Sequence, residues 1–110
     1  DARLMRTAGM TYTSLPGGRI SNLYNLKLAN KTHRDISYSL QLENMKGEIQ
    51  IIGNSNLVVK KEDYAQLQFF IILNRDEVKG WKTNLVIGMY ENNKKIKTID
   101  ATFIGPEIYN

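Results

Sequence analysis

The sequence contains no cysteine, two prolines, one tryptophan and one histidine among its 110 residues. The absence of cysteine excludes disulfides, thiolate metal sites, iron–sulfur ligation and cysteine nucleophiles within this chain. Long hydrophobic runs are also lacking, since residues 67–73 fall far short of the roughly 20 residues that a membrane-spanning helix needs. Side-chain packing must therefore stabilise the fold, and we expect no part of this chain to span a membrane.

The composition that remains is typical of one folded domain. Hydrophobic residues make up 42% and charged residues 24% of the chain, which is close to the average for soluble domains. The net charge of +4 is mild, and acidic residues lie beside the lysine clusters at 60–61 and 94–97. Such mixed clusters are typical of solvated strand ends, so we expect no nucleic-acid partner.

Apolar and polar residues alternate with a period of two in several segments, which predicts strands with one buried face. Ile20, Tyr24, Leu26 and Leu28 fall on one side of the first long strand. Further strands are expected at residues 10–13, 36–42, 48–52, 64–73, 84–90 and 96–103, whereas residues 57–59 are too few to assign. Both faces of residues 64–73 are apolar, which favours a central strand that is covered on both sides.

About seven strands at these spacings predict an all-β, immunoglobulin-like antiparallel sandwich of the fibronectin type, without a disulfide. Residues 1–9 are expected to be an approach segment, residues 10–106 the sandwich and residues 107–110 a tail. Asn92 and Asn93 suit a tight two-residue hairpin turn, because asparagine tolerates positive φ. The chain does not begin with methionine and shows no secretion signal, so we expect a piece of a longer chain.

No group of residues in the sequence has the spacing of a catalytic or metal site. His33 lies in a polar loop, and one histidine without cysteine is a poor ligand set for a transition metal. The four methionines do not cluster, which disfavours copper(I) binding, and the carboxylates are better explained as solvated turn residues. We therefore predict no catalytic, cofactor-binding or metal-binding residues.

Asn30 begins the sequence Asn30-Lys31-Thr32, which matches a glycosylation sequon. This three-residue pattern often arises by chance. An asparagine side chain can also bind the backbone two residues further on. We therefore interpret Asn30 as a turn former at the end of a strand.

Four segments carry a resemblance to a known family: residues 4–12, 18–24, 28–32 and 103–106. The first resembles an L-R-x-x-G-x-x-Y pattern, and the last, which reads Phe-Ile-Gly-Pro, resembles an F-x-G-P ending. In this order and spacing, the chain resembles the C-terminal immunoglobulin-like domain of the FixG family, also called the cytochrome c oxidase accessory protein CcoG. Residues 43–61 lack distinctive family residues, so strand pairing there stays open.

The resemblance implies a membrane-anchored, ferredoxin-like protein with two 4Fe-4S clusters, acting in maturation of a copper-containing terminal oxidase of the cbb3 type. The clusters would lie in a region upstream of this chain, and the domain would lie on the periplasmic side of the membrane. No cofactor residue is carried over, because this chain has no cysteine.

These implications lead to the hypothesis of a non-catalytic accessory domain that contacts its own membrane and ferredoxin region or an oxidase assembly factor. Sandwich loops commonly carry such contacts, so His33, Asn54 and Trp81 are the candidate contact residues. For Trp81, packing over the core is an equally good interpretation. The alternative function is a stand-alone adhesion module that recognises carbohydrate or protein.

Overall fold

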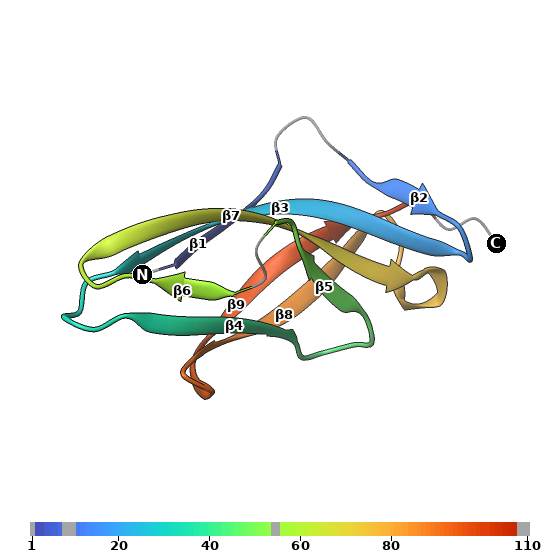
Figure 1. Ribbon diagram of the computed structural model, residues 1–110. Coiled ribbons are helices and arrows are strands. Elements are labelled where there is room, and N and C mark those ends of the chain that lie inside the picture. Colours follow the sequence, from blue (N-terminus) through green and yellow to red (C-terminus); the bar gives the residue numbers. More distant parts are fainter. Residues whose placement is uncertain (1, 8–10, 54–55, 108–110) are drawn as a thin grey trace.

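The computed structural model describes residues 2–7, 11–53 and 56–107, which form two antiparallel sheets packed face to face (Figure 1). The molecule is elongated, with dimensions of 54 × 25 × 20 Å. The described residues contain no helix that is long and apolar enough to cross a bilayer. This arrangement confirms the predicted all-β sandwich, which no disulfide crosslinks.

The first sheet is built around two twelve-residue strands that pair along their whole length. Its strand order is β1-β3-β7-β5, and β2 also pairs with β3. The bounds are β1 Ala2–Arg6, β2 Thr13–Leu15, β3 Arg19–Asn30, β5 Glu48–Ile51 and β7 Asp63–Asn74. The other partners of these two strands, β1, β2 and β5, are much shorter, so no strand among the described residues covers parts of the sheet edges.

The second sheet has the order β6-β4-β8-β9. Its strands are β4 Ile36–Leu42, β6 Leu57–Val59, β8 Lys82–Glu91 and β9 Lys94–Ile104, and a short 3-10 helix, η1 Arg75–Glu77, precedes β8. Asn92 and Asn93 join β8 to β9 with φ angles of 49° and 69°. The predicted hairpin turn at these two residues is confirmed, and its conformation is the one that asparagine tolerates.

The core lies between the sheets and contains the predicted apolar face of β3. Ile20, Tyr24, Leu26 and Leu28 are all buried there. The Tyr24 ring stacks on Phe69 of β7, with ring centroids 5.7 Å apart. The period-two alternation therefore identified the buried face of this strand correctly, because successive side chains of a strand point to opposite faces.

Polar side chains on the same face of β3 bond directly to the opposite sheet. Asn22 donates from Nδ2 to the Ile104 carbonyl oxygen at 2.9 Å, and its Oδ1 accepts from the Ile104 N–H at 2.8 Å. The Tyr24 hydroxyl donates to the Thr102 carbonyl oxygen at 2.7 Å, and burial raises the pKa of this phenol. These bonds tie β3 to β9 and explain how polar groups are tolerated in the core.

The N-terminal segment differs from the prediction. Residues 2–6 were expected to belong to an approach segment, but they form β1 and pair with β3 from Ala2 opposite Leu28 to Arg6 opposite Tyr24. Leu4 packs against the core. A five-residue strand with two arginines has little periodic signal of its own, and pairing with β3 decides its structure.

Other strand bounds shift by a few residues. The described part of the chain forms nine strands instead of about seven, because β1 and β6 add to the predicted set. The strand expected at residues 10–13 begins at Thr13, and Met10 lies outside the described residues. The central position of β7 is as expected, since it lies between β3 and β5, but the prediction that both of its faces are covered is wrong at its start, where Tyr64 is 75% exposed.

Candidate docking site

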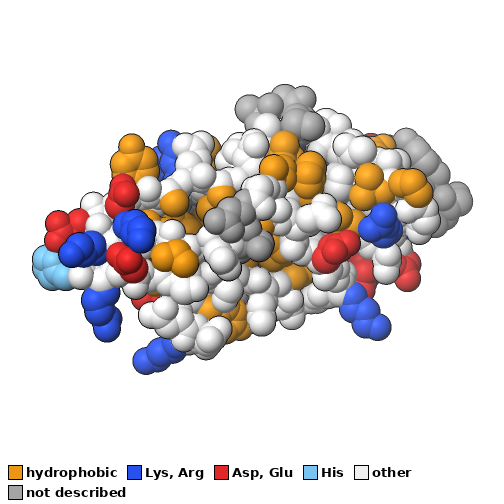
Figure 2. Space-filling view, viewed as in Figure 1, with side chains coloured by type: hydrophobic (Ala, Val, Ile, Leu, Met, Phe, Trp, Pro, Cys, Tyr) orange, Lys and Arg blue, Asp and Glu red, His pale blue; other side chains and the backbone are white. Residues whose placement is uncertain are grey.

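The loop between β3 and β4 places His33 at one end of the sandwich, with its side chain 91% exposed. His33 Nδ1 lies 2.7 Å from Glu62 Oε1, which comes from the loop before β7. Beside it, Asp35 accepts from the Lys61 N–H at 2.9 Å and lies 3.6 Å from Lys60 Nζ. The hydrogen bond from Lys61 is the main reason why the pKa of Asp35 is lowered. Figure 2 shows acidic and basic side chains together around the histidine, so this end of the sandwich carries charges of both signs.

Trp81 lies in the loop before β8, as predicted, and is 55% exposed. Lys82 Nζ lies 4.3 Å from the centroid of its ring, which is a cation–π contact. The Gly105 N–H donates to the Trp81 carbonyl oxygen at 3.1 Å, so the backbone of this loop is held by the end of β9. The ring is thus displayed at the surface on a fixed loop.

The structure does not bring the sequence-predicted contact residues together. Glu62, the partner of His33, directly precedes β7, whereas Trp81 lies beyond the other end of that strand. Twelve residues at about 3.3 Å each separate the two ends of β7 by about 40 Å. Asn54 lies outside the described residues. A contact role for any of these three residues stays a prediction, and His33 and Trp81 would belong to different contacts.

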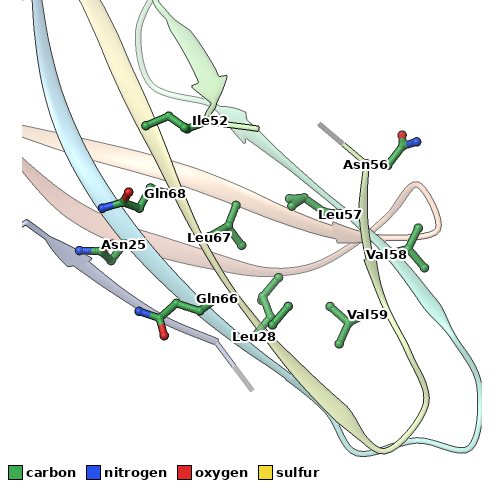
Figure 3. A pocket seen from close by; sticks show the side chains of 11 residues that line it. Asn25, Leu28, Ile52, Asn56, Leu57, Val58, Val59, Gln66, Leu67 and Gln68 are labelled. Carbon is green, nitrogen blue, oxygen red and sulfur yellow. The ribbon is translucent and has the colours of Figure 1, made fainter. Parts of the chain in front are cut away.

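A groove of about 580 Å³ lies along one side of the sandwich (Figure 3). It is a concave candidate for a binding site, and it was not predicted from the sequence. Its lining consists of Asn25, Leu28, Ile52, Asn56, Leu57, Val58, Val59, Ala65, Gln66, Leu67 and Gln68. These residues come from β3, β6 and β7 and from the connection between β5 and β6.

The groove exists because β5 covers only part of β7. Pairing between the two strands runs from Ile72 back to Phe69, and one further bond joins the Ile52 N–H to the Gln68 carbonyl oxygen at 3.0 Å. The next strand along the chain, β6, pairs with β4 in the other sheet. The first half of β7 therefore borders an open seam between the sheets.

The side chains that line the groove can contact a bound molecule, but none of them is a group that acid–base or nucleophilic catalysis uses. Leu28, Leu57 and Leu67 form an apolar floor, while Gln66 and Gln68 lie on the other side of β7 (Figure 3). All eleven lining residues are aliphatic or carry a neutral amide. None has an ionisable or nucleophilic side chain, which general acid–base or nucleophilic catalysis would require.

A separate polar cluster on the outer face of the second sheet consists of Glu43, Tyr90 and Lys95, and its bonds join neighbouring strands. Glu43 accepts from Lys95 Nζ at 2.6 Å through Oε1 and from the Tyr90 hydroxyl at 2.8 Å through Oε2. The bond from Lys95, followed by that from Tyr90, lowers the pKa of Glu43. Its carboxylate lies against Gly88, where a Cβ would come within 2.6 Å of it. Within the described ranges, no three His, Asp or Glu residues are grouped so that they could hold a metal ion.

The groove was missed because its walls come from distant parts of the sequence. One signal was available, since the strand expected at residues 48–52 is half as long as the one expected at residues 64–73. Such a mismatch predicts that part of the longer strand lacks a partner. Which part is left open depends on register, which the sequence pattern does not reveal.

Comparison with known proteins supplies the family. Residues 1–106 match the family model described as "IG-like fold at C-terminal of FixG". The chain belongs to this family. No curated protein matches the sequence.

Two solved structures resemble this FixG C-terminal domain. A FixG-related protein from Vibrio parahaemolyticus has a TM-score of 0.71 at 20% identity, and the match covers 94% of each chain. A protein from Archaeoglobus fulgidus has a TM-score of 0.45 at 14% identity over 98% of each chain. The first of these likenesses supports the immunoglobulin-like fold of the FixG C-terminal domain.

Proposed function

We propose that this chain is a non-catalytic accessory domain of a FixG-like, membrane-bound iron–sulfur protein and that it acts by protein–protein contact. The family match over residues 1–106 is the observation that carries the proposal. The groove supports a contact role, because its lining offers aliphatic and amide groups for binding and no ionisable group for catalysis.

In this proposal the redox chemistry belongs to an upstream region with two 4Fe-4S clusters, and this domain lies on the periplasmic side of the membrane. The contact serves assembly or copper maturation of a cbb3-type cytochrome oxidase. The domain binds either its own membrane and ferredoxin region or an oxidase assembly factor. A rigid sandwich is suited to this task, since it presents strand edges and loops in a fixed arrangement.

The test replaces this domain in the full-length protein by an unrelated immunoglobulin-like domain of similar length. We expect active oxidase to fall several-fold, while the amount of the membrane protein and its iron–sulfur absorbance stay unchanged. An unchanged level of active oxidase would contradict the proposal. Immunoblotting of the membrane fraction is the control for folding, because it detects a replacement protein that fails to accumulate.

The adhesion hypothesis makes a different prediction in the same cells. An adhesion module would leave oxidase activity unchanged after the replacement and would reduce attachment to a surface or to another cell. Measuring both properties in one strain therefore separates the two functions.

A further inference from the structure

We propose that the open edge of β7 beside the groove binds an extended segment of a partner protein, in which acidic and apolar residues alternate, as an additional strand of the first sheet. The inference deepens the proposed contact function and rests on it. It names the bound element, its chemistry and the residues that receive it.

The backbone of β7 offers the first part of the site. The Gln68 carbonyl oxygen accepts from Ile52, so the backbone groups of Gln68 point away from β3. Backbone groups of alternate residues point to the same side of a strand, so those of Gln66 also face the open edge. In the part of the chain that the structure describes, no strand pairs with this edge before Gln68. An incoming strand would continue the ladder at the point where β5 leaves it.

One residue limits the length of the added strand. Asp63 Oδ1 accepts from the Tyr64 N–H at 2.8 Å, so the start of β7 already has a partner. A charged residue at a strand end is a common protection against uncontrolled pairing. Because the Gln68 carbonyl oxygen already accepts from Ile52, we expect a short added strand centred on Gln66.

The groove offers the second part of the site. Side chains of an added strand would point alternately to the two faces of the sheet. On the inner face they would meet Leu57 and Leu67, which lie in the open seam (Figure 3). This floor favours apolar side chains at every second position of the bound segment.

Charge on the outer face offers the third part. Arg3 of β1 and Lys27 of β3 lie directly opposite each other and are both exposed. Among the described residues, neither has a carboxylate within salt-bridge distance, and like charges in opposite positions repel. Lys27 is in turn opposite Gln66 of β7. An added strand would be separated from Lys27 by β7 alone, so a carboxylate on its outer face would attract the Lys27 ammonium across Gln66.

A shallow hollow of about 450 Å³ connects these cations to the edge of β7. Its lining includes Arg3, Lys27, Tyr64 and Gln66, and Tyr64 is 75% exposed. Large exposed aromatic residues commonly anchor bound segments. The three parts together require a peptide backbone, apolar groups on one face and acidic groups on the other, which identifies the occupant as an acidic, extended polypeptide.

The first test uses peptides with the 110-residue chain. The probe is an eight-residue peptide of alternating glutamate and valine, and its controls carry lysine in place of glutamate or N-methyl groups on the amides that would pair. We expect binding of the glutamate peptide with NMR shift changes at the amides of Gln66 and Gln68. Each control peptide should bind at least tenfold more weakly. Equal binding of the glutamate and lysine peptides, or shift changes elsewhere on the protein, would overturn the proposal.

Variants of the protein give the second test. Gln66→Pro removes the N–H that faces the edge and should weaken binding at least tenfold, whereas Gln66→Ala keeps that N–H and should weaken it less than threefold. Lys27→Glu should also weaken binding at least tenfold, whereas Lys97→Glu makes the same charge change on the second sheet and should have no effect. Similar affinities for the two members of either pair would contradict the proposal.

Two further outcomes assign the edge to another occupant and overturn the acidic-segment proposal. One is a dimer of the chain that Gln66→Pro abolishes, since the occupant would then be a second copy. The other is peptide binding that fails while the domain replacement still lowers oxidase activity, since the accessory function would then act through a different surface.

Discussion

At the scale of single residues, Asn22 has a role that its polarity does not suggest. It is buried on the core face of β3, and both ends of its amide bond to the backbone of Ile104. Asn30 has a similar role at the end of the same strand, where its Oδ1 accepts from the Thr32 N–H at 3.0 Å and its Nδ2 donates to Val59. The prediction of Asn30 as a turn former is therefore confirmed.

Replacing Asn22 by leucine should lower the free energy of unfolding by about 2–4 kcal/mol, because the N–H and the carbonyl of Ile104 would both lose their partner. Asn25→Leu is the matched control on the same strand, where the amide donates to the side chain of Thr7, through Oγ1, at 3.2 Å. We expect that control to lower the free energy by about 1 kcal/mol or less. Urea denaturation measures both values, and an equal loss in the two variants would show that the inter-sheet bond is not important.

At the scale of secondary-structure elements, the outer face of the second sheet depends on one glycine. Glu43 follows β4, Gly88 lies in β8 and Lys95 lies in β9, so the ion pair between Glu43 and Lys95 spans all three strands. The bare backbone of Gly88 leaves room for the Glu43 carboxylate. Close approach, and not backbone conformation, is the reason for a glycine at this position.

Gly88→Ala should therefore displace the Glu43 carboxylate and raise the pKa of Glu43 back toward its ordinary value of 4.5. Because the folded-state pKa of Glu43 is lowered, its contribution to stability is present above pH 4.5 and is lost as the pH falls through the folded-state pKa. As the pH falls below 4.5, the free energy of unfolding of the variant should therefore decrease less than that of the parent protein.

Carbon-detected NMR titration of the Glu43 carboxyl measures this change directly. Glu43→Gln is the control, since it removes the titrating group and keeps the glycine. An unchanged Glu43 titration in Gly88→Ala would show that the carboxylate does not depend on this contact. Asp35, whose pKa is also lowered, should titrate alike in all three proteins.

At the scale of the whole molecule, the contacts that hold the sandwich together join distant parts of the chain. Arg19 pairs with Asn74 and Asn30 with Asp63 in the central ladder, and Asn22 bonds to Ile104 across 82 positions. Loops must therefore close before these contacts can form, which slows folding.

We expect refolding from urea to take milliseconds to seconds, the range that is typical of sandwiches dominated by distant pairings. Stopped-flow circular dichroism at several protein concentrations measures the rate and separates folding from association. Refolding in microseconds would indicate that local contacts dominate. The Asn22→Leu variant tests in addition whether the bond between the sheets forms before or after the rate-limiting step.

The sequence alone determined the positions of the long strands, the buried face of β3 and the turn at Asn92 and Asn93. These features depend on neighbours within a few residues, through side-chain alternation and local backbone preference. The family likeness was also readable from short segments, and the match over residues 1–106 bears it out.

Only the tertiary structure decided that Ala2–Arg6 is a strand and that His33 and Trp81 lie at opposite ends. It also decided that no strand of the described residues covers the edge of β7 beside the groove. Each of these depends on which strands pair and in which register. Pairing partners lie tens of residues apart, and a pattern of period two is the same for every partner, so it cannot choose among them.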